Sequence, residues 1–290
     1  MTEPKVQIAY ADAARVDRVG MRLLKVMLAL LFLPLLELWR SSRRLLSKSR
    51  SPMAVVVYYR RILSWERARF GRQMDMLLRW STLIRASDEL PLSSRAVLVT
   101  FDDGWQSFCE VALPELEGRQ IPTLIFLISG RLGQTFETGC PERLMTEDEV
   151  RTVARDFVTI GSHSDSHVKM PGLPEPATRY ELRSSREKLS QITGRDVNLF
   201  CFPFGVADPE SVRLCREEGY IRAFTGIPGF FWPNKFTTGR VRVDPSDWTI
   251  EYFLKIVGAY SWMAGAIAAK SRIRSSFATL LQTRKLRLQR

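Results

Sequence analysis

The chain has 290 residues, of which 45% are hydrophobic and 26% charged, with 17 glycines and 15 prolines. This composition is that of a globular protein, so it excludes intrinsically disordered, collagen-like and disulfide-scaffold proteins. The formal net charge of +12 is uneven, with +7 in residues 1–60, +7 in residues 261–290 and −2 between them. A nucleic-acid-binding domain is expected to carry its own basic face. The charge pattern therefore favours a near-neutral catalytic or binding domain with basic ends.

Residues 1–50 predict an N-terminal extension built around an apolar segment. Residues 26–36 carry no charge, and basic residues flank them on both sides: Arg22, Lys25, Arg40, Arg43, Arg44, Lys48 and Arg50. A helix that spans a bilayer needs about 20 apolar residues, and Pro34 interrupts this shorter run. A signal peptide also fits poorly, because no small-residue cleavage site follows. We favour attachment to the membrane surface, with a helix packed on the domain and a true span as alternatives.

Residues 51–250 predict one α/β domain, because strands and helices alternate along them. Apolar runs at residues 54–59, 95–101, 121–128, 157–160, 199–202 and 220–225 are expected to be strands. Apolar spacing and capping signals predict helices at residues 65–84, 104–117, 146–155, 177–192 and 208–218. This alternation implies parallel β/α units, open or closed into a barrel. Such barrels place their chemistry at the carboxyl ends of the strands.

Residues 251–290 predict a C-terminal extension of the same kind as the first. Residues 256–269 are uncharged, and seven basic residues with no acidic one follow in residues 270–290. Tyr260 and Trp262 are of the types that favour a membrane interface, and a basic cluster suits an anionic leaflet. We therefore expect a membrane-associated protein. If a span exists, the heavier positive flank on its carboxyl side would place the body in the cytoplasm.

Two adjacent carboxylates, Asp102 and Asp103, follow the predicted strand at residues 95–101. Neighbouring carboxylates repel each other, and a metal ion held by one of them would compensate and leave the other free to act as a base. The alternative is a helix N-terminus, where the helix dipole favours acidic residues.

The only two histidines of the chain, His163 and His167, lie together in His-Ser-Asp-Ser-His, directly after the strand at residues 157–160 and Gly161. Four-residue spacing on a turn can place both imidazoles on one side. Two imidazole nitrogens and one carboxylate are a frequent set of ligands for a divalent metal, with positions left for water and substrate. The alternative is a pair of structural histidines. The His-x-Asp of iron oxygenases fits poorly, because its distant second histidine is missing.

A third element, Phe202-Pro203-Phe204-Gly205, ends the predicted strand at residues 199–202. Proline fixes φ and glycine permits a tight turn. Such a turn can direct the backbone N–H of Phe204 into the site, although alone it would be read as an ordinary aromatic turn.

These three elements, in this order, resemble the motifs of the polysaccharide deacetylases, the NodB homology domain or carbohydrate esterase family 4. The motifs are Thr100-Phe101-Asp102-Asp103-Gly104, His163-Ser164-x-x-His167 and Phe202-Pro203-Phe204-Gly205, and the likeness runs from about residue 55 to residue 244. The resemblance implies a distorted (β/α)7 barrel, to which this sequence adds apolar and basic helical extensions at both ends. It also implies metal-dependent deacetylation of sugars.

By position, the resemblance implies that Asp103, His163 and His167 bind a divalent metal ion, for which we expect Zn²⁺. Asp102 would be the general base, and we infer that the Phe204 N–H stabilises the oxyanion. The expected partners are an N-acetylated glycan or glycolipid substrate and an anionic membrane surface, with no nucleic acid.

The sequence departs from the family pattern in two places. The family usually supplies the general acid from a further histidine, but none follows His167, and the early Tyr-His position holds Tyr59. The arginine often found in the third motif, where it orients the base, is replaced by Cys201. Tyr59, Asp165 or protonated Asp102 could donate the proton instead. Loss of a general acid costs about 10²–10⁴-fold in rate, so a weak or inactive sugar-binding relative is one alternative function. Nucleic-acid binding by the basic tails is another.

Overall fold

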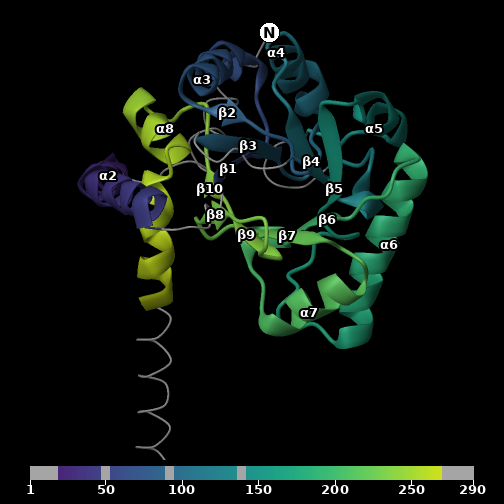
Figure 1. Cartoon of the computed structure of the whole chain (residues 1–290). Coiled ribbons are helices and arrows are strands. Elements are labelled where there is room, and N and C mark those ends of the chain that lie inside the picture. The colour runs from purple at the N-terminus through teal and green to yellow at the C-terminus, as the bar shows by residue number, and fades with distance from the viewer. Residues whose placement is uncertain (1–18, 47–52, 89–94, 136–141, 270–290) are drawn as a thin grey trace, which may run out of the picture.

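A parallel sheet curls into a nearly closed barrel that carries helices on its outer side (Figure 1). The structure, a computed structural model, describes residues 19–46, 53–88, 95–135 and 142–269. Strands pair in the order β10-β1-β3-β4-β5-β6-β7-β9, and each neighbouring pair in this path is parallel. The predicted distorted β/α barrel with an N-terminal helix is therefore confirmed.

The strands are β1 (Ala54–Tyr59), β2 (Thr82–Leu83), β3 (Ala96–Phe101), β4 (Thr123–Leu127), β5 (Val158–Ser162), β6 (Leu199–Cys201), β7 (Arg222–Thr225), β8 (Phe230–Phe231), β9 (Thr237–Gly239) and β10 (Val241–Arg242). The α-helices are α2 (Val19–Leu46), α3 (Arg67–Trp80), α4 (Leu113–Glu117), α5 (Glu147–Val153), α6 (Glu175–Thr193), α7 (Pro209–Glu217) and α8 (Thr249–Ile256). A further helical stretch covers Ala259–Ala269.

Most of the predicted elements are present, and the differences have physical reasons. The capping box at Thr146 and the left-handed glycine at Gly194 begin and end α5 and α6 as expected. The helix predicted over residues 104–117 is present from residue 106, but its middle is a π-helix, Phe108–Ala112, and α4 follows directly. Pro114 has no backbone N–H, so it cannot donate the hydrogen bond by which an α-helix would continue from the preceding turn. The strands after residue 225 were not predicted, because each has only two or three residues.

Alternate residues of the strands face two different cores. One cluster contains Ala54 and Val56 of β1, Leu98 of β3, Phe126 of β4 and Cys201 of β6, and it fills the barrel interior. The other contains the intervening residues of β1 and β3 together with side chains of the surrounding helices. This alternation decides which side chain at the end of each strand reaches the barrel mouth.

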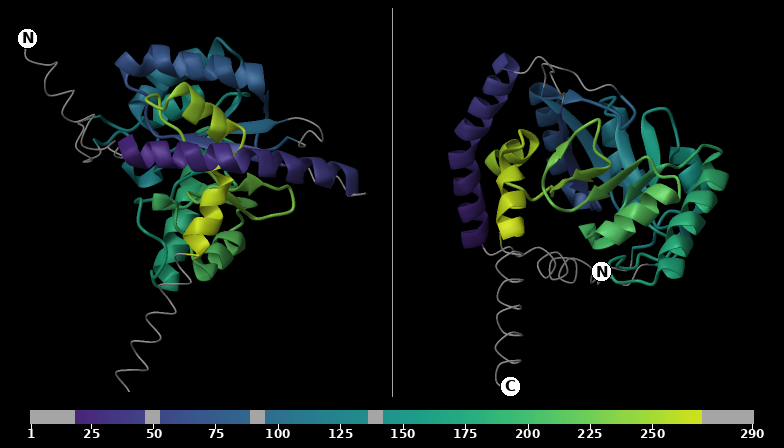
Figure 2. Two further views of the ribbon diagram at one scale, coloured as in Figure 1. Left: turned by 90° about the vertical axis from the view of Figure 1, so that its left-hand side faces the viewer. Right: turned by 60° about the horizontal axis from the view of Figure 1, so that its bottom comes forward.

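Helix α2 lies along the outside of the barrel, with α8 and the stretch after it between α2 and the sheet (Figure 2). Its Val26 and Ala29 join the same core cluster as Tyr252 and Ile256 of α8. By length and composition alone, α2 could cross a membrane, and so could the bent pair formed by α8 and Ala259–Ala269. The predicted boundaries near residues 50 and 250 stay predictions, and the basic residues 270–290 lie outside the described part of the chain.

Candidate active site

Asp102 and Asp103 follow β3 at the carboxyl end of the barrel, where the backbone turns sharply. The Asp102 N–H donates to the carbonyl oxygen of Tyr59 at 3.0 Å, which continues the ladder between β1 and β3. Asp103 then has a φ of +73° and Gly104 a φ of +89°. A positive φ is unusual for a residue with a side chain, and here it turns two consecutive carboxylates in different directions.

The histidine segment is a tight turn rather than the start of a helix. The His163 N–H donates to the carbonyl oxygen of Leu127 at 2.8 Å, and the His167 N–H donates to Ser164 Oγ at 2.9 Å. Ser164 and His167 both have a positive φ, of 66° and 64°. Glu181 of α6 holds the turn by accepting hydrogen bonds from the N–H groups of residues 165 and 166. The turn brings the two imidazole centroids to 5.0 Å.

Asp103, His163 and His167 come together as the sequence predicted. Asp103 Oδ1 lies 3.5 Å from Nε2 of each histidine, and the three side chains could hold a metal ion between them. Asp103 is fully buried and His163 is 2% exposed. The arrangement is a compact set of one oxygen and two nitrogen ligands in a protected position, as at catalytic metal sites.

The surrounding contacts leave one free oxygen on Asp103. Its Oδ2 accepts hydrogen bonds from Arg60 Nε at 2.8 Å and Trp105 Nε1 at 3.0 Å. Its Oδ1 is buried with no hydrogen-bond partner among the described residues. His163 Nδ1 lies 2.7 Å from the carbonyl oxygen of Cys201, so that a proton on Nδ1 leaves the Nε2 lone pair facing Asp103. An orphaned buried oxygen facing two imidazole nitrogens fits a divalent metal ion.

The protonation states also suit a cation. Burial would raise the pKa of Asp103, but the Arg60 guanidinium and the two imidazoles hold it below its ordinary value. Burial lowers the pKa of His163, and it lowers the pKa of His167 to about 4. Asp103 is therefore ionised and both imidazoles are neutral at pH 7, as metal binding requires.

Asp102 is held by Arg240, a residue that the sequence analysis missed. Arg240 lies between β9 and β10 and is 1% exposed. Its NH1 donates to Asp102 Oδ1 at 2.7 Å and its NH2 to Oδ2 at 2.9 Å. NH2 also lies 2.9 Å from Cys201 Sγ. Burial disfavours a charged guanidinium, but the pair with Asp102 outweighs this and raises the pKa of Arg240. The guanidinium that the third motif lacks because of Cys201 is thus supplied by Arg240, from the junction of β9 and β10.

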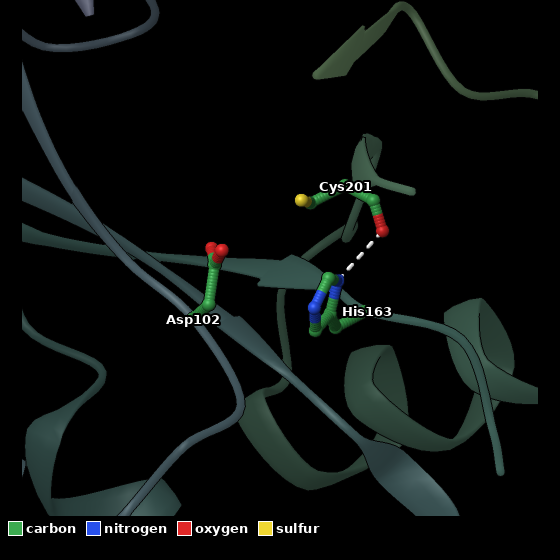
Figure 3. A group of neighbouring side chains, drawn as sticks. All are labelled: Asp102, His163 and Cys201. Atoms are coloured by element: carbon green, nitrogen blue, oxygen red, sulfur yellow. Dashed lines mark hydrogen bonds between the residues drawn. The ribbon is translucent and has the colours of Figure 1, made fainter. Parts of the chain in front are cut away.

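Asp102, His163 and Cys201 form a second group of potential metal ligands (Figure 3). Two observations argue against a metal there. Both Asp102 oxygens and the Cys201 sulfur already contact the Arg240 guanidinium. Burial also raises the pKa of the Cys201 thiol well above its ordinary value, whereas the thiolate is the metal ligand. The Arg240 guanidinium, rather than a metal ion, therefore supplies the positive charge in this second group.

Phe204 lies at the rim of the site. Its backbone has a φ of 60°, its side chain is 66% exposed, and its ring centroid lies 4.8 Å from that of His167. The predicted turn is therefore present beside a metal-ligand candidate. The role of its N–H toward an oxyanion stays a prediction.

The structure does not bring Tyr59 to this cluster. Its hydroxyl donates to Gln73 Oε1 at 2.8 Å, on the side of β1 that faces the helices. The preceding residue, Tyr58, points into the barrel instead, with its ring 4.4 Å from the Arg240 guanidinium. Asp165, a second suggested donor, accepts a hydrogen bond from Ser129 Oγ at 2.7 Å. Strand alternation could have shown that Tyr58 and Asp102 share the barrel interior.

Comparison with known proteins assigns a family to this arrangement. Residues 90–223, which contain all three motifs, match the family model described as polysaccharide deacetylase. The segment that carries the candidate site is therefore similar to the polysaccharide deacetylases. The chain is also 25% identical over 167 residues to the Bacillus subtilis protein YxkH, whose name assigns it provisionally to the polysaccharide deacetylases. The match covers 57% of this chain and 57% of YxkH, so the chain spans just over half the length of that relative.

Solved structures show the same fold. The structure of IcaB from Ammonifex degensii is similar with a TM-score of 0.63 and 25% identity, over 71% of this chain and 97% of IcaB. Streptococcus pyogenes deacetylase PplD in complex with acetate has a TM-score of 0.61 and 17% identity, over 71% of this chain and 99% of PplD. The barrel fold is thus common to these proteins.

Proposed function

We propose that this protein is a metal-dependent hydrolase that removes acetyl groups from N-acetylated sugars of a polysaccharide or lipid-linked glycan. The observation that carries the proposal is the buried Oδ1 of Asp103, without a hydrogen-bond partner among the described residues and 3.5 Å from both imidazole nitrogens. Zn²⁺ is the proposed ion, because a carboxylate oxygen and two imidazole nitrogens are ligands it accepts at catalytic sites.

The residues around that site divide the steps of amide hydrolysis between them. A divalent cation bound there would polarise the acetyl carbonyl and lower the pKa of the attacking water. Asp102 accepts the proton of the water as the new C–O bond forms. Arg240 keeps the Asp102 carboxylate in one orientation through two hydrogen bonds. The Phe204 N–H is proposed to donate to the developing oxyanion.

The leaving amine needs a proton when the C–N bond breaks and acetate departs. Tyr59 and Asp165 are engaged in hydrogen bonds with Gln73 and Ser129. Protonated Asp102 is the remaining candidate of the three, and it can return the proton that it took from water. The proposed cycle therefore uses Asp102 first as base and then as acid.

Acetate release from N-acetylglucosamine oligomers tests this proposal. The Zn²⁺-supplemented protein is expected to release acetate, and Asp103→Asn is expected to lose at least about 10²-fold in rate together with bound metal. Asp75→Asn is the matched control, because Asp75 is an exposed carboxylate on α3. Equal rates for Asp103→Asn and the wild type would refute the assigned ligand.

A sugar-binding protein with little or no hydrolysis is the second candidate. It is favoured by the histidine count, because both histidines of the chain lie in the metal cluster and no third one can act as acid. Binding of N-acetylglucosamine oligomers without acetate release, at any metal supplement, would support it against the hydrolase.

We also propose that the enzyme works at an anionic membrane surface, on the cytoplasmic side, where a glycolipid substrate would be within reach. The support is the apolar helix α2 and the basic residues that flank it in the sequence. An N-acetylated glycolipid in anionic vesicles should then be deacetylated faster than a soluble sugar with the same head group. Equal rates would count against a membrane-bound substrate.

A further inference from the structure

Helix α2 carries an inner apolar stripe that fits the body of the protein. Val26, Ala29, Leu33 and Leu36 follow one another at intervals of three or four residues, which places them on one face of a helix. Val26 is 7% exposed, Ala29 is fully buried and Leu36 is 4% exposed. This face packs on α8 and on the 3-10 turn Ala259–Ser261.

A second apolar stripe runs along the opposite face of α2 and is exposed. Its members are displaced by about two residues from the inner stripe, which corresponds to roughly 200° around the helix. They are Leu24 (49% exposed), Met27 (60%), Leu31 (70%), Leu35 (63%) and Leu38 (68%). A surface helix of a soluble protein usually has a polar outer face, and contiguous exposed apolar surface of this length marks an interaction site.

Contacts of Arg22 hold the amino-terminal end of α2 against residues 246–251 of the barrel domain. Its NH2 lies 2.6 Å from Glu251 Oε2 and 3.1 Å from the carbonyl oxygen of Ser246. Its guanidinium also lies 4.5 Å from the ring centroid of Trp248. Glu251 is 4% exposed, so separating the pair would leave a buried carboxylate with fewer partners, which is costly.

The carboxyl-terminal end of α2 also contacts the barrel domain, at residues 230–232. Arg40 is 8% exposed and lies over the ring of Phe230, at 5.6 Å from its centroid. The Trp39 ring stacks on Phe230 with a centroid distance of 6.4 Å, and the Arg43 guanidinium lies 4.9 Å from Trp232. The helix is therefore held along its whole described length, about 42 Å for 28 residues.

From these contacts we infer that α2 lies flat in the interfacial region of a lipid bilayer, with its outer stripe facing the lipid and both ends on the same side. A transmembrane orientation would require the contacts at one end or the other to break. The inference deepens the membrane attachment proposed above and does not depend on the deacetylase chemistry.

The charges of α2 favour lipid over a second protein copy as the occupant of the exposed stripe. Its only acidic residue, Glu37, pairs with Arg40 at 2.8 Å and with Arg95 at 3.3 Å. The other charged residues of the helix are basic, and basic flanks beside an apolar face are attracted to anionic head groups. The uncharged stretch Ala259–Ala269 begins with residues 259–261, which pack on α2, and its Ile267 is 42% exposed, so it adds apolar surface.

Vesicle binding tests the lipid-facing stripe. The full chain should co-sediment with vesicles of phosphatidylglycerol and phosphatidylcholine, and the triple variant Met27→Glu, Leu31→Glu, Leu35→Glu should bind at least tenfold more weakly. The matched control is Leu78→Glu, Tyr180→Glu, Ile221→Glu, which changes three apolar side chains of similar exposure (48%, 63% and 64%) on other faces. The control should bind like the wild type.

Labelling of the two ends tests the flat orientation. Val19→Cys and Ser41→Cys are made singly, and membrane vesicles of both orientations are treated with a membrane-impermeant maleimide and read peptide by peptide. Both positions should react in one vesicle orientation and neither in the other. Reaction of the two ends in opposite orientations would show a span and overturn the inference.

Two further results would also overturn it. One is equal vesicle binding by the triple variant and the control. The other is a wild type that does not bind vesicles and forms dimers, together with a triple variant that stays monomeric. A second copy of the chain would then cover the stripe. Acetate release from soluble oligomers and thermal unfolding are measured for every variant, so that a failed deacetylase proposal or a misfolded variant is recognised separately.

Discussion

Arg240 and Asp102, which are 138 positions apart in the chain, form a buried bidentate ion pair. The nitrogen–oxygen distances are 2.7 and 2.9 Å, and the same guanidinium contacts the Cys201 sulfur at 2.9 Å. Such fork-like pairs fix geometry as well as charge. The proposed base is therefore oriented by a side chain from the junction of β9 and β10.

We expect Arg240→Lys to lower kcat about 10²-fold while metal content stays unchanged. Lysine keeps the positive charge but not the planar fork, so Asp102 would be held in a less defined orientation. Steady-state acetate release and metal analysis on the same preparation measure this. Arg222→Lys is the control, because Arg222 donates to the carbonyl oxygens of residues 232, 233 and 235, away from the site. An unchanged kcat for Arg240→Lys would show that the fork has no role in the reaction.

The two adjacent tyrosines of β1 should respond differently to loss of the hydroxyl. Tyr59→Phe removes the buried hydrogen bond to Gln73 and should cost about 1 kcal/mol of unfolding free energy with kcat unchanged. Tyr58→Phe should lower kcat roughly tenfold and leave stability nearly unchanged, because it removes a hydroxyl that interacts electrostatically with both Arg240 and Asp102 but keeps the ring that contacts Arg240. Urea unfolding and acetate release separate the two effects. The reverse pattern would return Tyr59 to the list of catalytic candidates.

The fold was predictable because its elements repeat a strong local pattern. The six residues Ala54–Tyr59 are apolar or aromatic throughout, and the structure has the predicted strand with these bounds. The short strands β8, β9 and β10 gave no such signal, since two or three residues do not show a period. Their pairing comes from the closing of the barrel, which is a tertiary effect.

The site was predictable where short, recognisable motifs contain its residues. Asp103, His163 and His167 are identified by residue type and spacing, and the structure brings them together. Arg240 was missed because its role depends on where a short strand returns to the sheet. Tyr59 was selected by its motif position, although strand alternation turns its neighbour Tyr58 to the barrel interior.

The metal-free protein should lose stability as the pH falls from about 6.5 to 4. Burial lowers the pKa of His167 to about 4, so in this window the unfolded chain binds more protons than the folded chain. The unfolding free energy therefore decreases with acidification, by on the order of 3 kcal/mol for this group. Urea unfolding in the presence of a chelator measures the slope. His167→Gln should flatten the curve, and an equally steep curve for that variant would assign the effect to other groups.

The position of the guanidinium, rather than the residue that carries it, should decide activity. Cys201 lies where the family pattern often has arginine, and its sulfur is 2.9 Å from Arg240 NH2. We expect Arg240→Cys to lose most activity and at least about 3 kcal/mol of unfolding free energy, because buried Asp102 loses its partner. We expect the double variant Cys201→Arg, Arg240→Cys to regain much of both, since it returns one guanidinium to the same space.

The exchange is informative because volume and charge are conserved across the pair of positions. Cys201→Arg alone should be strongly destabilised, since two guanidinium groups would then share one carboxylate inside the barrel. The coupling between the two substitutions should therefore be large and favourable in both unfolding free energy and kcat, as a double-mutant cycle measures it. Additive effects of the two changes would show that an arginine at position 201 does not replace Arg240 as the partner of Asp102.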